Sequence, residues 1–205
     1  MSLLSKIRFL SVFVAVAVLA GCTYSGSHSP KSSEQSPKDP SEWTSVNSAV
    51  DISVTEDESF EFADSRRFQF GFTGENSDSK GDLDFSQLKR RKVLIKFKIG
   101  PDAPADFKFK PDGRDAMWIE RKDELIKALL EENNGELPEE ISPRGPYPVG
   151  GTQFTNFKVS KDGKRLSVLV ANTGQTTFRY NLRFDYKGET VQFDPDIGTN
   201  GESHQ

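Results

Sequence analysis

The chain has 205 residues, with 27 basic and 31 acidic side chains, a formal net charge of −4 and a single cysteine. With one thiol the chain cannot form an intramolecular disulfide, so a folded domain must be stabilised by its core alone. The excess of acidic side chains argues against a nucleic-acid partner, because phosphate binding needs a basic face. It also argues against adhesion to anionic headgroups by charge alone.

The first residues have the composition of an export signal. Lys6 and Arg8 precede an apolar run over 9–20, and Gly21 and Cys22 follow that run. About 12 apolar residues are too few for a membrane-spanning helix, which needs roughly 20. The pattern therefore predicts a signal peptide over 1–21, cut between Gly21 and Cys22. An ordinary secretory signal that ends near a cysteine is the alternative.

The sequence Leu-Ala-Gly-Cys at 19–22 resembles the lipobox of bacterial lipoproteins. The resemblance implies diacylglycerol on the Cys22 thiol, acylation of the new amino group, and attachment to a membrane of the cell envelope. Because position 23 is threonine and not aspartate, it also implies the outer membrane if the host is Gram-negative. Each buried CH₂ contributes about 0.8 kcal/mol, so two or three acyl chains would hold the protein on the membrane. The resemblance covers the first 22 residues and implies nothing about the fold that follows.

The segment after the signal is rich in serine, proline and charged residues. Residues 22–48 are predicted to be the lipidated cysteine and a disordered tether, because they have too few apolar side chains to offset the entropy of ordering. Roughly twenty such residues span about 25 Å. Loss of Lys6 and Arg8 with the signal leaves 25 basic against 31 acidic side chains, a formal charge of about −6.

Residues 49–198 hold most of the remaining apolar side chains and are predicted to form a single β-rich domain, with 199–205 as a flexible tail. Alternation of apolar and polar residues with period 2 indicates strands that have one buried face. Strands are predicted at 68–72, 93–99, 166–170 and 178–186, and from weaker patterns at 52–55, 59–62, 106–110, 116–119, 154–159 and 190–193.

The clearest pattern lies at 178–186, where five apolar or aromatic residues alternate with four polar ones. A strand places the two sets on opposite faces of its sheet. We expect the apolar set to be buried and the polar set to meet solvent. The residues predicted to be buried are Tyr180, Leu182 and Phe184, and those predicted to be solvent-exposed are Arg179, Asn181 and Arg183.

One helix is predicted at about 121–133, because its leucines and isoleucine share a face and Asn134-Gly135 supplies a stop. Many short strands with one inserted short helix indicate a mainly β protein, an antiparallel immunoglobulin-like β-sandwich. Roughly the last 45 residues also resemble the C-terminal hairpins of small uncharacterised bacterial β proteins that close with an Asp-Pro-x-Ile segment, here 194–197. That second resemblance implies a β-sandwich and no activity.

The predicted domain lacks the residue types that most catalysis needs. The histidines, His28 and His204, fall in the tether and the tail, and Cys22 is the only thiol. Triad hydrolases, zinc enzymes with His or Cys ligands, haem proteins and thiol redox proteins are therefore disfavoured. We expect no enzymatic activity and no cofactor besides the covalent lipid. An envelope enzyme that uses two carboxylates on a glycan, or a bound metal, is the alternative.

Two acidic segments are candidates for calcium, which takes carboxylate and carbonyl oxygens. The segment 76–84 alternates oxygen-bearing side chains as an EF-type loop does, but Lys80 takes a ligand position and Gln87 replaces the bidentate glutamate. The segment 194–201 also alternates such side chains. Ordinary acidic turns are the alternative for both. The candidate ligands are Asn76, Asp78, Asp82, Asp84, Asp194 and Asp196.

Two further features each allow two explanations. The run Lys-Arg-Arg-Lys at 89–92 either grips phosphates of an envelope polyanion or keeps the following strand from pairing with a neighbour. Trp118 either offers its ring to a sugar or fills the core. Taken with the anchor, the sequence predicts a lipid-anchored envelope protein whose domain binds a protein or glycan partner without catalysis.

Overall fold

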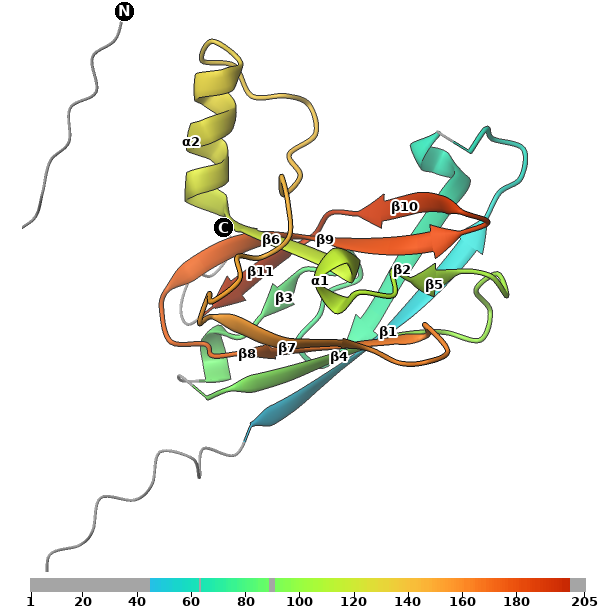
Figure 1. The fold of residues 1–205 in the computed structure, drawn as a ribbon, viewed down its shortest axis with the longest axis horizontal. Coiled ribbons are helices and arrows are strands. Elements are labelled where there is room, and N and C mark those ends of the chain that lie inside the picture. Colours follow the sequence, from blue (N-terminus) through green and yellow to red (C-terminus); the bar gives the residue numbers. More distant parts are fainter. Residues whose placement is uncertain (1–44, 63, 89–90, 200–205) are drawn as a thin grey trace, which may run out of the picture. The chain divides into compact units, whose positions relative to one another are not determined.

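The described residues, 45–62, 64–88 and 91–199 of a computed structural model, form two β-sheets and two short α-helices (Figure 1). In the first sheet β1 and β4 lie at the centre, and β7 and β2 lie at the edges. Its five strands run in the order β2 (Phe68–Gly74), β1 (Val46–Glu56), β4 (Val93–Ile99), β8 (Arg165–Val170) and β7 (Phe154–Val159).

The second sheet is organised around β9 (Thr176–Tyr186), which pairs with a different strand on each edge and at each end. Leu182 shows the two edges, because it is opposite Met117 on one side and Phe193 on the other. The partners of β9 are β5 (Lys108–Phe109) and β6 (Met117–Arg121) on one edge, and β10 (Glu189–Phe193) and β11 (Asp196–Thr199) on the other, with β3 (Leu83–Asp84) beside β11.

The helix expected at about 121–133 is present as α2 (Lys122–Glu132), directly after β6. It ends where Asn134 and Gly135 take positive φ angles of 55° and 92°, and the Gly135 N–H donates to the carbonyl of Leu130. The other helix, α1 (Gly113–Ala116), is a single turn ahead of β6. In Figure 1 α2 stands on the side of the second sheet, away from β1, β4, β7 and β8.

The predicted mainly β sandwich with one short helix is confirmed, and two strand pairs in it are parallel. β1 runs parallel to β4, and β3 runs parallel to β11. The cause lies in the chain path. After β2 covers one edge of β1, the chain crosses to the second sheet at β3 and returns to start β4 at the end where β1 starts. The remaining pairs within both sheets are antiparallel.

The core fills the space between the sheets and is rich in phenylalanine. Phe184 of β9 lies 4.8 Å from Phe107 and 4.9 Å from Phe109, measured between ring centroids. Burying one such side chain stabilises the fold by about 1.5 to 3 kcal/mol. The buried inward set that was predicted for β9, namely Tyr180, Leu182 and Phe184, is confirmed. Other fully buried large side chains are Phe85, Phe97, Phe154, Ile52, Leu83, Ile95, Met117 and Ile119.

The predicted solvent exposure of the opposite face of β9 is wrong. Asn181 is 0% exposed and its amide donates to the Ser142 hydroxyl at 3.1 Å. The Arg183 side chain is only 14% exposed, forms an ion pair with Asp115, and stacks on the Trp118 ring at 3.9 Å. The segment around Ser142 and the helix α1 cover this face, so the sheet has side chains packed on both sides. Trp118 therefore lies under Arg183, outside the core between the sheets.

Several predicted boundaries also need correction. β1 begins at Val46, so residues 46–48 of the predicted tether belong to the first sheet, and Thr199 of the predicted tail belongs to β11. The strand predicted at 59–62 is absent, because the Asp57 carboxylate binds the N–H and hydroxyl of Ser59 and makes a turn there. Within the described ranges, no helix has both the length and the apolar character that crossing a bilayer requires.

Candidate functional site

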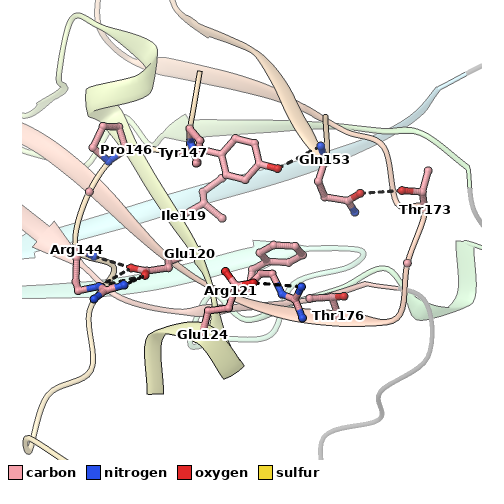
Figure 2. Close-up of a pocket in the computed structure, with 14 residues that line it drawn as sticks. Ile119, Glu120, Arg121, Glu124, Arg144, Pro146, Tyr147, Gln153, Thr173 and Thr176 are labelled. Carbon is pink, nitrogen blue, oxygen red and sulfur yellow. Dashed lines mark hydrogen bonds and ion pairs between the residues drawn. The ribbon is translucent and has the colours of Figure 1, made fainter. Parts of the chain in front are cut away.

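A pocket of about 660 Å³ opens at one end of the sandwich, where β6 ends and β9 begins (Figure 2). Ile119 and Phe178, from these two strands, give it an apolar floor. The segment 144–153 contributes one wall, and Thr173 and Thr176, before and at the start of β9, contribute another. Loop residues at the end of a sandwich can be substituted without disturbing the core, so binding sites are often built from them.

The wall around Tyr147 is held in place by several contacts. Its hydroxyl oxygen accepts the Gln153 N–H at 3.3 Å, and its ring lies edge-on to Phe154 with centroids 5.1 Å apart. The Gln153 side-chain oxygen in turn accepts the Thr173 hydroxyl at 2.9 Å. A side chain at Gly151 could not coexist with this arrangement, because a Cβ there would lie 2.4 Å from the Tyr147 ring.

The rim carries two arginines, Arg144 from the segment 144–153 and Arg121 at the end of β6, whose guanidinium groups are paired with carboxylates. Arg144 binds Glu120 through both its side chain and its backbone N–H, and reaches Glu132 at 3.2 Å. Arg121 binds Asp123 at 2.6 Å and lies 3.3 Å from Glu124. Such paired groups are fixed in position and still offer free donor and acceptor positions at their edges. Figure 2 shows Arg144 with Glu120 on the side of the pocket away from Gln153 and Thr173, and Arg121 with Glu124 closer to Thr176.

The groups that line this pocket can contact a ligand in two ways, through apolar surfaces and through polar edges. The pocket contains an apolar floor, one phenol and planar amide, carboxylate and guanidinium groups, which together match a ligand with apolar faces and hydroxyl edges. Among the described residues that line it there is no histidine or cysteine, and the Thr173 hydroxyl donates to the Gln153 side-chain oxygen, while the backbone N–H of Thr176 donates to the Thr199 hydroxyl. A sugar has such faces and edges.

A second hollow, of about 800 Å³, contains the carboxylates that come closest to the pair that the enzyme alternative requires. Burial and the neighbouring Glu140 carboxylate raise the pKa of Asp194 to about 6, although the hydrogen bond from the Ser142 hydroxyl opposes the shift. Glu140 and Asp194 both line this hollow. Glycoside hydrolases hold their two carboxyl groups at least about 5 Å apart, with the sugar between them. The enzyme alternative has its nearest carboxylate pair in Glu140 and Asp194, which share one hollow.

The carboxylates of the first calcium candidate accept backbone N–H groups. Asp78 accepts the N–H groups of Lys80 and Asp82, and Asp84 accepts the Ser86 N–H at 2.8 Å. Asn76 donates its amide to the Ser48 hydroxyl at 3.3 Å. These are the bonds of polar turns, which was the alternative explanation for 76–84.

The second calcium candidate lies beside the first, because β11 pairs with β3. The Asp196 N–H donates to Asp82 at 2.7 Å, and the Asp196 carboxylate forms ion pairs with Lys122 at 2.8 Å and Arg179 at 3.1 Å. Across 45–62, 64–88 and 91–199 no three acidic, histidine or cysteine side chains converge as metal ligands would. The calcium hypothesis therefore gains no support from the geometry.

The lipidation residue Cys22 and the cleavage position at Gly21 lie outside the described residues. The pocket residues Glu120, Arg144 and Tyr147 were not predicted from the sequence. For Arg144 and Tyr147 the one local signal is the segment 136–151, which is long and rich in proline and glycine, and long irregular segments in compact domains are often functional. Glu120, in β6, has no such signal. No known protein family and no curated protein matches this chain.

Proposed function

We propose that this protein is a lipid-anchored component of the bacterial cell envelope whose β-sandwich domain binds an envelope glycan without catalysis. The anchor is the acylated Cys22, with the outer membrane as its destination in a Gram-negative host. The binding site is the pocket between Tyr147 and the Glu120 and Arg144 pair.

The observation that carries the binding site is the ring of Tyr147, fixed at the pocket wall and facing a rim of paired charges. A ring held in advance loses little conformational entropy when a ligand stacks on it. Within the described part of the chain, the Tyr147 hydroxyl accepts from Gln153 and has no acceptor for its own hydrogen, so it can donate to a ligand hydroxyl. Glu120 and Arg144 provide an acceptor and donors on the other side.

Glycan binding is tested by co-sedimentation of the domain with purified peptidoglycan sacculi and by titration with soluble lipopolysaccharide-derived polysaccharide. Tyr147→Ala should weaken binding at least fivefold, since stacking on an aromatic ring contributes about 1 kcal/mol. Gly151→Ala should weaken binding similarly, because its Cβ would displace the ring. Gln69→Ala is the control, because Gln69 is exposed on β2 and does not line the pocket.

The proposal fails if the wild-type domain binds neither polymer, or if Gln69→Ala and Gly151→Ala bind equally well. Release of new reducing ends from the sacculi, abolished by Asp194→Asn, would instead establish the hydrolase alternative. If the domain binds an envelope protein and neither polymer, the proposed glycan ligand is wrong, while the proposal of a lipid-anchored binding domain stands.

The anchor is tested separately with labelled palmitate in cells that express the full chain. The wild type should incorporate the label and fractionate with membranes. Cys22→Ser should incorporate none and accumulate as the uncut precursor, because no thiol is left to modify. A wild-type protein without label would disprove the lipid anchor and leave the glycan experiment unaffected.

A further inference from the structure

The outer face of the first sheet is basic, although the protein as a whole is acidic. Lys96 and Lys98 of β4 point outward beside Arg165 of β8 and Lys158 of β7, and all four are exposed. We call these four residues the basic face. Asp51 of β1, which lies 3.9 Å from Lys98, is the one carboxylate on the described strands of this face.

The pairing register brings these cations together. Lys98 lies directly opposite Arg165, and Lys96 and Lys158 both lie opposite Ser167, one on each side of it. Like charges on directly opposite positions of neighbouring strands destabilise a sheet. Among the described residues, Lys96, Lys158 and Arg165 form no ion pair, so the repulsion between the two lysines is not compensated. Asp162, at the rim near Arg165, attracts that guanidinium and also holds its own turn through Ser160 and Lys164.

The basic face is also hollowed. The small side chains of Ala49 and Ser167 lie on the row of Lys96, and the four cations surround a depression of about 470 Å³. A depression of this kind can receive an anionic group between the flexible lysine stems while their apolar parts stay packed.

The acidic residues gather elsewhere. Between Asp123 and Glu140, in α2 and the segment after it, the chain has seven carboxylates and one lysine, Lys127. This region stands on the side of the second sheet, whereas the basic face is on the outside of the first (Figure 1). The charges are therefore unevenly distributed over the molecule, which its net charge does not show. An anionic surface would attract the basic face and repel the acidic region.

The chain also enters the domain at this sheet. The Val46 N–H, at the start of β1, donates to the carbonyl of Lys92 at 2.8 Å, next to the exposed Arg91 and Lys92 ahead of β4. We infer that the basic face docks on a bilayer of anionic phospholipid headgroups. The inference rests on the proposed anchor, because acylation of Cys22 would hold the start of β1 near a bilayer. Anchor and basic face then act as two membrane-binding signals on one chain.

Docking is measured with a chain that lacks the acylated Cys22, so that only the basic face can bind the vesicles. The domain, as the compact unit that begins at Asp39, is sedimented with vesicles of phosphatidylcholine alone and of phosphatidylcholine mixed with phosphatidylglycerol. It should bind the anionic vesicles, and added salt should weaken that binding. Each cation near such a surface strengthens binding about fivefold. The double variant Lys96→Gln and Lys158→Gln should therefore bind about 25-fold more weakly.

The matched control is the double variant Lys80→Gln and Lys127→Gln, which removes the same charge from exposed lysines outside the first sheet. It should bind as the wild type does. Equal loss in both double variants, equal binding to neutral vesicles, or no binding to anionic vesicles would overturn the inference. Binding to soluble polyphosphate without binding to vesicles would overturn it too. Because the chain tested lacks Cys22, these outcomes do not depend on lipidation, which the palmitate experiment decides.

Discussion

Two adjacent residues of β9, Arg183 and Phe184, test how the second sheet is covered. Phe184 is fully buried, with ring centroids of Phe107, Phe109 and Phe70 at 4.8, 4.9 and 5.6 Å. Its truncation to alanine removes a core aromatic and leaves a cavity, which costs about 3 to 5 kcal/mol. This value depends only on the inner face of the sheet.

Arg183→Ala tests the outer face. If that face met solvent, the change would cost within about 0.5 kcal/mol. The structure instead stacks the guanidinium on Trp118, a contact that contributes about 1 to 2 kcal/mol when shielded from water. The ion pair adds less than about 1 kcal/mol, because the Asp115 side chain is 46% exposed and stays solvated. We therefore expect a loss of about 2 kcal/mol.

Equilibrium urea unfolding of the unit that begins at Asp39, followed by circular dichroism, measures both losses. Gln192→Ala, on an exposed position of β10, is the reference and should change the free energy of unfolding by less than about 0.5 kcal/mol. If Arg183→Ala matches Gln192→Ala, the segment around Ser142 and α1 do not cover β9. If Phe184→Ala does not exceed Arg183→Ala, the inner face is misassigned.

Three further outcomes follow from single residues. The pKa of Asp194 is raised from 3.8 to about 6, so the folded protein binds more protons than the unfolded chain between these values and its stability falls as pH rises through them. Asp194→Asn should remove this fall and be more stable than the wild type at pH 7 in thermal unfolding, whereas an unchanged pH profile would contradict the assignment. Gly113→Ala should cost about 1 to 3 kcal/mol in urea unfolding, because its Cβ would lie 2.6 Å from the backbone of Phe157; a neutral effect would mean that α1 does not pack on β7. Thr23→Asp should move the protein to the inner membrane in a Gram-negative host, which membrane fractionation would detect or refute.

The sequence was most informative where one physical cause dominates. Alternation predicted β4 at 93–99 and β9 at 178–186 because the core between the sheets decides which face is apolar. It failed on β11, where Asp196 to Thr199 are all buried and no alternation exists. It also failed on Asn181 and Arg183, because polar residues are buried when partners such as Ser142 and Asp115 arrive from distant parts of the chain.

The pocket was beyond sequence reasoning for the same reason. Glu120 and Arg144 are 24 positions apart, and nothing local indicates that they meet. Tyr147 lies in a segment that predicts only irregular structure, and its position depends on Gln153, Phe154 and the absence of a side chain at Gly151. Alternation reports which face of a strand is buried, but the contacts between irregular segments depend on the complete fold.

The conclusion drawn from the net charge of the sequence differs most from the one drawn from the positions of the charges in the structure. A net charge of −4 argued against adhesion to anionic headgroups, and that argument treats the charges as evenly spread. The antiparallel pairing of β8 with both β4 and β7 brings cations from three strands onto one face, whereas β1 adds only the carboxylate of Asp51. A neighbouring surface responds to the charge within about 8 to 10 Å, since ions screen the more distant α2 region. The local charge of the basic face, and not the net charge, therefore determines whether this domain can adhere to a bilayer.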